Sequence, residues 1–350
     1  MWLLARQGQR SAALAQYEAC REILARELNL EPAVETAVLY ERIRAGDIDR
    51  PAPQHPTPQP LPRPRPFGSQ TTPFVAGPPI TRPAQFFGRE RELKRLFNLL
   101  KRLPLQNAAL VGPRRSGKTS LLHYLRTITT TPPGQLRPAQ RADWLPVPQQ
   151  YRWVFVDFQD PRLGGRRALL HHLLTQMELP TPDACDLDQF LDIVSDNLQR
   201  PTVVLLDEIG VALARYPELD DAFWESLRSL ATNQVGGALA FVLAASEAPE
   251  LLAHHQGMGS PFFNIFGYTA HLGPLTDDEA QELIASSPIP FTAADVVWIL
   301  AQSGRWPMPL QILCRERLLT LEEGDLGDAW REDAQQQIAP FLELKTPTAM

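Results

Sequence analysis

The chain has 350 residues, of which 44% are hydrophobic and 21% are charged, and its formal net charge at pH 7 is −6. This composition excludes a globally disordered chain, and the length predicts two or three domains. No apolar run approaches the ~20 residues of a membrane-spanning helix, and residues 1–4 are soon followed by Arg6, so neither a membrane span nor a signal peptide is expected. The cysteines, Cys20, Cys185 and Cys314, are far apart and lack metal-ligand spacing, which favours a reducing, cytoplasmic environment.

The charge is unevenly distributed along the chain. Residues 1–150 carry 22 Lys and Arg against 11 Asp and Glu, whereas residues 151–350 carry 12 against 29. A basic half is a feature of some nucleic-acid-binding proteins. Here the basic residues are scattered and have no aromatic residues interleaved, so direct nucleic-acid binding is not expected.

Residues 1–48 form the first predicted segment, a helical hairpin. Apolar residues recur at helical spacing before and after Pro32, Gly8 lies at the centre of a turn, and Gly46 is placed as a C-cap. The pattern resembles one tetratricopeptide-type hairpin. A lone hairpin cannot bury its apolar face, so we expect it to pack against another part of the chain or against partners that are missing.

A proline-rich linker is predicted for residues 49–83. Twelve of residues 51–83 are proline, which predicts an extended, semi-rigid spacer without a core.

From residue 84 the pattern alternates between helices and strands. We expect an α/β core over residues 84–274, a C-terminal helical lid over residues 275–340 and a tail over residues 341–350. The expected strands are continuous apolar runs between helices, which predicts a parallel sheet covered by helices on both faces. Together with the phosphate-binding loop pattern of residues 112–119, this sheet predicts the P-loop NTPase class. The expected strands are residues 108–111, 153–157, 203–206 and 239–244, and the expected helices are residues 89–102, 166–178, 219–232, 277–286, 292–302 and 307–320.

Residues 112–119 match the phosphate-binding loop pattern G-x-x-x-x-G-K-[ST] without a mismatch. An apolar strand precedes the loop and an amphipathic helix follows it, as the motif requires. The backbone N–H groups of such a loop and the helix N-terminus bind phosphates, while Lys118 reaches the β- and γ-phosphates and Thr119 holds Mg²⁺. The predicted nucleotide-binding residues of the loop are Gly112, Pro113, Arg114, Arg115, Ser116, Gly117, Lys118, Thr119 and Ser120.

A second motif, four apolar residues followed by Asp207 and Glu208, places two carboxylates at the C-terminal end of a buried strand. Ligands bind at this end of strands in α/β sheets. We expect Asp207 to hold Mg²⁺ and Glu208 to act as the general base for the attacking water. The spacing from Lys118 fits the P-loop subclass with an extra strand between the two motifs. Ser246, just past the next strand, is a candidate sensor of the γ-phosphate, although an ordinary strand-end serine fits equally well.

At this point the chain resembles the STAND-type AAA+ ATPases. Residues 77–93 are similar to the box that opens the ATPase module of that family and lies beside the adenine. The resemblance implies contacts with the adenine from Phe87, Gly88 and Arg89. It also implies ATP and ADP as ligands, and the chain has no N-K-x-D motif for reading guanine.

The same resemblance extends into the predicted lid. Residues 272–280 are similar to the entry into the lid of the family, and residues 303–307 are similar to its G-x-P motif, which implies that Pro307 packs near the adenine. Arg305 stands where the family more often has a second glycine, which bears on the local geometry of the lid.

Residues 3–46 resemble the C-terminal part of the bacterial transcriptional activator domain, which is tetratricopeptide-like. In that family a winged-helix DNA-binding domain and further helices come first. We therefore expect a truncated or late-started product.

The predicted function is a Mg-ATP-dependent ATPase that acts as a slow conformational switch in signalling or transcription regulation. Residues 251–267 contain no Arg or Lys to serve as an arginine finger. Arg228 is the candidate for a finger acting in trans during nucleotide-dependent self-association, although an arginine at this place on a helix is more often simply solvated. A protein partner is expected. The alternatives are a regulatory scaffold that binds nucleotide without hydrolysing it, as part of a DNA-binding transcriptional regulator, and an ATPase that nucleic acid stimulates.

Overall fold

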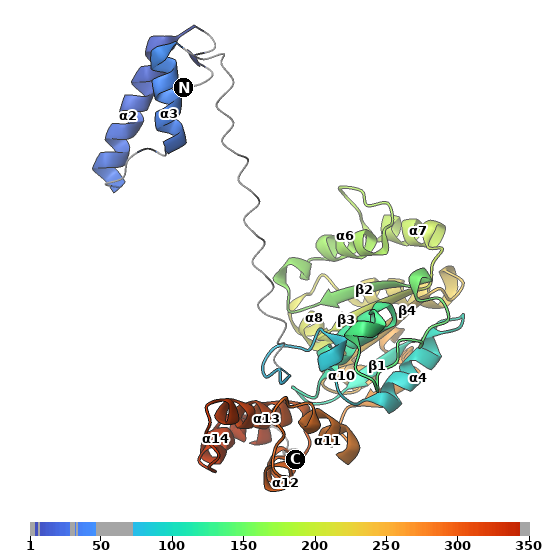
Figure 1. Cartoon of the computed structure of the whole chain (residues 1–350). Coiled ribbons are helices and arrows are strands. Elements are labelled where there is room, and N and C mark those ends of the chain that lie inside the picture. The colour runs from blue at the N-terminus through green and yellow to red at the C-terminus, as the bar shows by residue number, and fades with distance from the viewer. Residues whose placement is uncertain (1–3, 6–7, 29–31, 33, 47–72, 344–350) are drawn as a thin grey trace. The chain divides into compact units, whose positions relative to one another are not determined.

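The computed structural model describes residues 4–5, 8–28, 32, 34–46 and 73–343 (Figure 1). The chain divides into two compact units, residues 1–71 and 72–350. Most of the predicted linker, residues 49–72, lies outside the described residues, as does most of the predicted tail. Residues 73–83, which composition assigned to the linker, belong to the second unit, where the side chain of Phe74 is only 1% exposed.

The first unit contains the predicted helical hairpin, α2 (Arg10–Leu28) and α3 (Val34–Ala45). The rings of Tyr17 and Tyr40 stack between the two helices with their centroids 4.2 Å apart. Gly46 has φ +79° and follows α3 directly, which confirms the predicted helix end, because glycine adopts this backbone conformation without strain.

The second unit is built around a five-stranded parallel sheet with the strand order β2-β3-β4-β1-β5. The strands are β1 (Ala108–Val111), β2 (Arg152–Asp157), β3 (Thr202–Asp207), β4 (Leu239–Ala245) and β5 (Tyr268–His271). β4 lies between β1 and β3, as expected for the subclass with an extra strand between the two motifs. The sequence did not indicate β5, because its four residues are too short a run to show periodicity.

In the described residues four helices follow β5, in the region that the sequence predicts as the lid. They are α11 (Asp277–Ala285), α12 (Ala293–Ser303), α13 (Pro307–Glu322) and α14 (Trp330–Glu343). Arg305 occupies the predicted glycine position with φ +62°, and its guanidinium pairs with the Asp277 carboxylate at 2.9 Å. An arginine is therefore accommodated in the left-handed conformation, and it ties the start of α13 to the start of α11.

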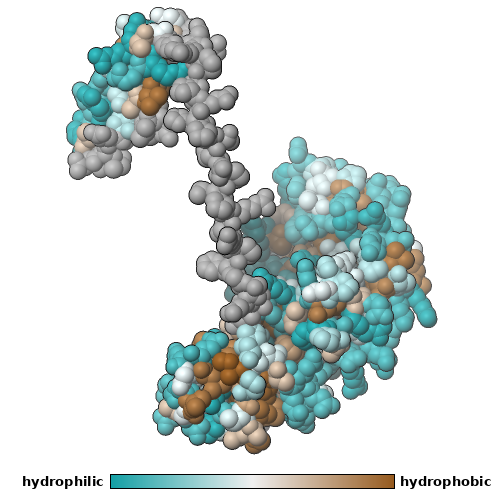
Figure 2. All heavy atoms as spheres, viewed as in Figure 1, coloured by the Kyte–Doolittle hydropathy of each residue, from teal (hydrophilic) through white to brown (hydrophobic). Residues whose placement is uncertain are grey.

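On the face of the molecule that Figure 2 shows, the lid is more hydrophobic than the sheet domain. In Figure 2 hydrophobic residues gather over the lid, whereas hydrophilic residues dominate the visible sheet domain. The exposed large hydrophobic residues of the lid are Val297, Leu319 and Leu326. No helix in the described part of the chain is long and apolar enough to cross a membrane.

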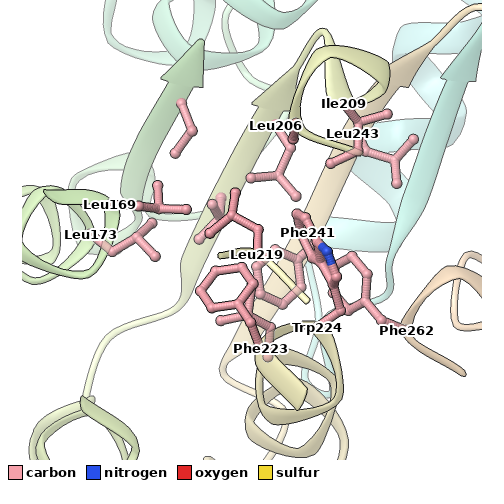
Figure 3. Close-up of a cluster of buried hydrophobic side chains, with 14 of the residues drawn as sticks. Leu169, Leu173, Leu206, Ile209, Leu219, Phe223, Trp224, Phe241, Leu243 and Phe262 are labelled. Carbon is pink, nitrogen blue, oxygen red and sulfur yellow. The ribbon is translucent and has the colours of Figure 1, made fainter. Parts of the chain in front are cut away.

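Helices cover both faces of the sheet, as predicted. One face packs against α6 (Arg166–Met177), α7 (Leu187–Asn197), α8 (Ile209–Arg215), α9 (Asp221–Ser229) and α10 (Pro249–His255). Figure 3 shows this core, in which Trp224 lies near Phe223, Phe241 and Phe262. Phe262, Phe263 and Phe266 are all buried here, as expected for core residues. The other face packs against α4 (Glu90–Leu100), α5 (Lys118–Thr127) and the proline-rich loop 128–150.

Three helices on the first face, α7, α8 and α10, were not predicted. The sequence of α7 carries the signals, since the Asp186 side chain caps it by accepting a hydrogen bond from the Gln189 N–H, and Phe190 and Val194 are buried at helical spacing. α8 has only seven residues, too few for a clear periodic pattern. The helix expected at residues 219–232 is shorter, because α9 runs into a π-turn at residues 230–234.

Candidate functional site

A cavity of about 320 Å³ lies at the C-terminal ends of β2 and β3, beside the phosphate-loop residues and against the lid helix α13. This volume is in the range of small-molecule sites. The lining residues are Val75, Gly77, Pro78, Pro79, Ile80, Arg114, Arg115, Gly117, Lys118, Thr119, Ser120, Asp157, Gln159, Asp207, Glu208, Pro307, Met308 and Gln311.

The loop between β1 and α5 has a backbone that only certain residues allow. Gly117 has φ +94° and caps α5, so the free N–H groups at the start of α5 face the loop. A Cβ on Gly112 would lie 2.8 Å from the Leu272 carbonyl oxygen and 2.9 Å from Ser116 Oγ. Gly112, Pro113 and Ser116 do not line the cavity but belong to the turn that shapes it.

Lys118 is the buried cation of the site. Its Nζ donates to the carbonyl oxygens of Gly112 at 2.8 Å and Pro113 at 3.0 Å. Burial lowers the pKa of the Lys118 ammonium, while the carboxylates of Glu208 and Asp207 raise it. The ammonium is thus held against the loop, where a phosphate would lie.

Asp207, at the end of β3, is only 2% exposed and meets Thr119 of α5. Burial raises the pKa of Asp207 to about 6, and the hydrogen bond with the Thr119 hydroxyl opposes this rise. Hydroxyl and carboxylate oxygens are ligands that Mg²⁺ prefers. In the described residues no three His, Cys, Asp or Glu side chains could hold a metal together. The oxygen pair therefore fits Mg²⁺, which takes most of its ligands from phosphates and water.

Glu208 follows Asp207 directly and also lines the cavity. Its backbone has φ +54° and precedes α8, and its N–H donates to Asp207 Oδ1 at 3.1 Å. The side chain of Glu208 is only partly buried and lies close enough to affect the Lys118 ammonium. A carboxylate in this position can accept a proton from a water molecule in the cavity.

The structure adds cavity residues that the sequence reasoning missed. Asp157 and Gln159 come from the end of β2, and Asp157 pairs in register with Asp207. The signal was present, because Asp157 ends an apolar strand just as Asp207 does.

The segment 75–80 forms one wall of the cavity; residues 77–80 belong to the box that the resemblance places beside the adenine, but none of them was singled out. The Val75 N–H donates to Gln311 Oε1 of the lid at 3.0 Å, and the Ile80 N–H donates to Ser120 Oγ at 3.0 Å. Arg115 donates to the Gly77 carbonyl oxygen at 2.6 Å. The segment thus connects the phosphate loop to α13. Its own sequence does not indicate these partners, because they come from distant parts of the chain.

Phe87, Gly88 and Arg89 do not line the cavity wall where the resemblance placed them. Phe87 packs in the lid core, and the guanidinium of Arg137 lies 3.7 Å from the centroid of its ring. Arg89 is 5% exposed and donates to the carbonyl oxygens of Ser116 and Gly273. The chain turns at Gly88 and Arg89, which both have positive φ. This turn lets Phe87 reach the lid core while Arg89 contacts the phosphate loop on the side away from the cavity.

The remaining predicted residues divide between the cavity and its surroundings. Pro307 lines the cavity beside Met308. Ser246 is exposed just after β4 and is not among the lining residues. Arg228 lies on α9, partly buried and away from the lining residues.

Comparisons with known proteins bear on the domains and the fold of the chain. The model of the AAA ATPase domain family matches residues 85–242, and that of the bacterial transcriptional activator domain matches residues 1–44. No curated protein gives a significant match.

Several solved structures resemble the chain at low identity. A Walker-type ATPase of Pyrococcus abyssi is 18% identical, with 76% of this chain and 77% of that chain covered and a TM-score of 0.52. The ORC2 protein of Aeropyrum pernix, in ADPNP–ADP complexes, is 16% identical, with 72% and 66% covered and a TM-score of 0.49. Cdc6p of Pyrobaculum aerophilum is 18% identical, with 68% and 63% covered and a TM-score of 0.48. Residues 85–242 therefore match an AAA ATPase domain and residues 1–44 a bacterial transcriptional activator domain, and the parallel sheet of the second unit has the P-loop NTPase fold.

Proposed function

We propose that the second unit binds ATP together with Mg²⁺ in the cavity beside the lid and hydrolyses the ATP. The observation that carries this proposal is the cavity itself, which Thr119, Asp207 and Lys118 line together. It joins a pair of metal-binding oxygens to a phosphate-binding cation, which is the arrangement that phosphoryl transfer needs. The apolar residues Pro78, Pro79, Ile80 and Met308 also line the cavity and suit a flat base.

In this mechanism the N–H groups of the loop and Lys118 bind the β- and γ-phosphates, and Thr119 and Asp207 hold the metal. When bound, Mg²⁺ neutralises charge on the phosphate oxygens. Glu208 orients a water molecule and accepts its proton as the water oxygen bonds to the γ-phosphorus. The bond between that phosphorus and the bridging oxygen of the leaving ADP breaks, and ADP and phosphate are the products.

The finer part of the proposal is a slow conformational switch. Polar contacts join the lid to the rest of the unit: Gln311 with the Val75 N–H, Glu279 with the Arg89 N–H, and Glu282 with Arg137 at 3.2 Å. Loss of the γ-phosphate would remove contacts between the nucleotide and the residues that line the cavity, and the lid would then shift relative to the sheet domain. Slow turnover is supported by residues 251–267, which contain no Arg or Lys. Arg228 is proposed as a finger acting in trans within a nucleotide-dependent self-association.

The activator-domain match over residues 1–44 supports a role in transcription regulation. The resemblance to STAND-type proteins extends this proposal to signalling. We further propose that the protein acts in the cytoplasm with a protein partner, and that this chain does not bind nucleic acid directly. The missing finger in residues 251–267 also favours a second candidate, a regulatory scaffold that binds ATP without turning it over.

The experiment that tests these proposals compares ATP binding and turnover in the wild type, Lys118→Ala and Glu208→Gln with Mg²⁺ present. We expect Lys118→Ala to abolish nucleotide binding, because it removes the buried cation of the loop. Glu208→Gln should retain binding and lose turnover, because the amide cannot accept the proton. ATP binding without turnover in the wild type would favour the scaffold, whereas a rise in turnover on adding DNA would favour a nucleic-acid-stimulated ATPase. Unchanged affinity in Lys118→Ala would refute the assignment of the loop.

A further inference from the structure

Asp157 is a carboxylate in the cavity for which the proposed chemistry has so far no role. It ends β2 and pairs in register with Asp207 at the end of β3. Neighbouring parallel strands lie about 4.8 Å apart, and residues in register project from the same face of the sheet. The residues two and four positions before each carboxylate pack on the face that α5 covers, so both carboxylates emerge on the side of Thr119.

The immediate surroundings of Asp157 leave its charge without a cation. Its Oδ1 accepts a hydrogen bond from the Gln159 N–H at 2.8 Å, which closes a local turn. Within residues 73–343 Asp157 takes part in no ion pair. An uncompensated carboxylate would repel the phosphates of a bound nucleotide unless a cation lies between them.

The metal ligands proposed for this cavity are Thr119 and Asp207, and Asp157 is not one of them. No three His, Cys, Asp or Glu side chains in the described residues are arranged to hold one ion, although Asp157, Asp207 and Glu208 all line the cavity. Mg²⁺ at nucleotide sites keeps several of its water ligands, and these waters need hydrogen-bond acceptors. The free oxygen of Asp157, on the β2 side of Asp207, is such an acceptor.

We infer that Asp157 is a positioning residue for the metal, whose carboxylate accepts hydrogen bonds from water molecules bound to the Mg²⁺ that Thr119 and Asp207 hold. This inference rests on the proposed function of the cavity. Partners of this kind, one step removed from the metal, typically contribute 10–100-fold to its affinity.

The test measures metal dependence of nucleotide binding rather than turnover. A fluorescent ATP analogue is titrated into wild type, Asp157→Asn and Asp160→Asn, first in EDTA and then over a range of Mg²⁺ concentrations. Asp157→Asn keeps an oxygen that accepts the Gln159 N–H, so the turn is preserved while the charge is lost. Asp160 is the matched control, because it lies on the same loop, pairs with Arg162 and does not line the cavity.

We expect the Mg²⁺ concentration at half-maximal binding to rise about tenfold in Asp157→Asn. Affinity in EDTA should stay the same or improve, because a negative charge near the phosphates is removed. Asp160→Asn should match the wild type in both conditions. A merely structural role for Asp157 would weaken binding equally with and without Mg²⁺, and that result would overturn the inference, as would an unchanged Mg²⁺ requirement.

Two further variants distinguish a wrong role for Asp157 from misfolding of Asp157→Asn and from an error in the proposed function. Asp157→Ser also removes the charge and keeps an acceptor for the Gln159 N–H, so it replaces Asp157→Asn if that variant does not fold. Asp157→Glu restores the charge and should recover part of the Mg²⁺ dependence. If the wild type binds no nucleotide in either condition, the proposed function itself is wrong. If it binds with a Mg²⁺ dependence that Asp157→Asn shares, only the role of Asp157 is wrong.

Discussion

The backbone N–H of Arg89 donates a 2.6 Å hydrogen bond to Oε1 of Glu279, a lid residue 190 positions later. The other oxygen of Glu279 accepts from the Thr276 N–H at 2.9 Å and completes the capping box of α11. One carboxylate thus serves both the start of a lid helix and the contact between the lid and the turn behind the phosphate loop. The close approach requires Gly88, since a Cβ there would lie 2.8 Å from Glu279 Cδ.

Replacing Glu279 with Ala should therefore loosen the lid. The substitution removes a charge-assisted hydrogen bond and a helix cap, so we expect a loss of about 1.5–3 kcal/mol in the free energy of unfolding. Urea denaturation measures this loss. Asp278→Ala is the control, because Asp278 is exposed on the same turn, and it should stay within about 0.5 kcal/mol of the wild type. Equal stability of the two variants would contradict the role of Glu279.

Gly112→Ala should disable the phosphate loop. The added Cβ would meet the backbone oxygen of Leu272, which cannot move without displacing the chain after β5. We expect nucleotide affinity to fall at least about tenfold, measured by equilibrium binding of a fluorescent ATP analogue. Gly134→Ala is the matched control, since nothing lies within 4 Å of a Cβ there and its φ is not positive. Binding by Gly112→Ala at the wild-type level would show that the loop tolerates a side chain at this position.

The raised pKa of Asp207, about 6, predicts a pH dependence of metal-assisted binding. A carboxyl group must lose its proton to bind a metal, so the gain in nucleotide affinity from Mg²⁺ should be full above pH 7 and shrink as the pH falls through 6. A single group with this pKa predicts about a tenfold smaller gain at pH 5 than at pH 7. The measurement is the ratio of nucleotide Kd values with and without Mg²⁺ at each pH. The control is Asp207→Asn, in which ATP still titrates but residue 207 does not. If the wild type and this variant showed the same pH profile, the prediction would be wrong.

The buried ion pairs of the lid predict a loss of stability in acid. Burial raises the pKa of Asp295, but hydrogen bonds from Thr292, Arg331 and Arg317 together with the nearby guanidinium charges outweigh it, so the pKa lies below its usual range. Arg317 and Arg331 reach the carboxylate at 2.9 Å and 3.1 Å. A depressed pKa stabilises the fold above the unfolded value of about 3.9 and loses that effect as the pH falls below it.

Asp295→Asn tests this prediction. At pH 7 it should lower the free energy of unfolding by about 3–5 kcal/mol, because two guanidinium groups lose their anionic partner. Between pH 5 and pH 3 the variant should lose less stability than the wild type, since the titrating group is gone. Urea denaturation at several pH values measures both effects. Parallel pH profiles of the two proteins would show that Asp295 does not contribute to the acid sensitivity.

Local patterns in the sequence were sufficient for most elements and for the chemistry of the site. The apolar runs that end at Val111 and Asp207 became central strands because a strand buried on both faces must be continuously apolar, and that signal is local. The motif at residues 112–119 likewise predicts phosphate binding from sequence alone, because its glycines and Lys118 are close together in the chain. β5 and α8 were missed because four and seven residues carry too little periodicity.

The walls of the cavity and the role of Arg89 were decided only by tertiary structure. Segment 75–80 lines the cavity because its hydrogen-bond partners, Ser120 and Gln311, come from helices that are far away in the chain. The Arg89 guanidinium lies against the phosphate loop because it donates hydrogen bonds to the carbonyl oxygens of Ser116 and Gly273. Asp157 becomes a neighbour of Asp207 only through the order and register of the strands. The sequence by itself determined which elements form and which residues carry the phosphate chemistry, because adjacent residues specify both. Contacts between distant segments depend on how the sheet and the lid pack together, and no local pattern encodes that packing.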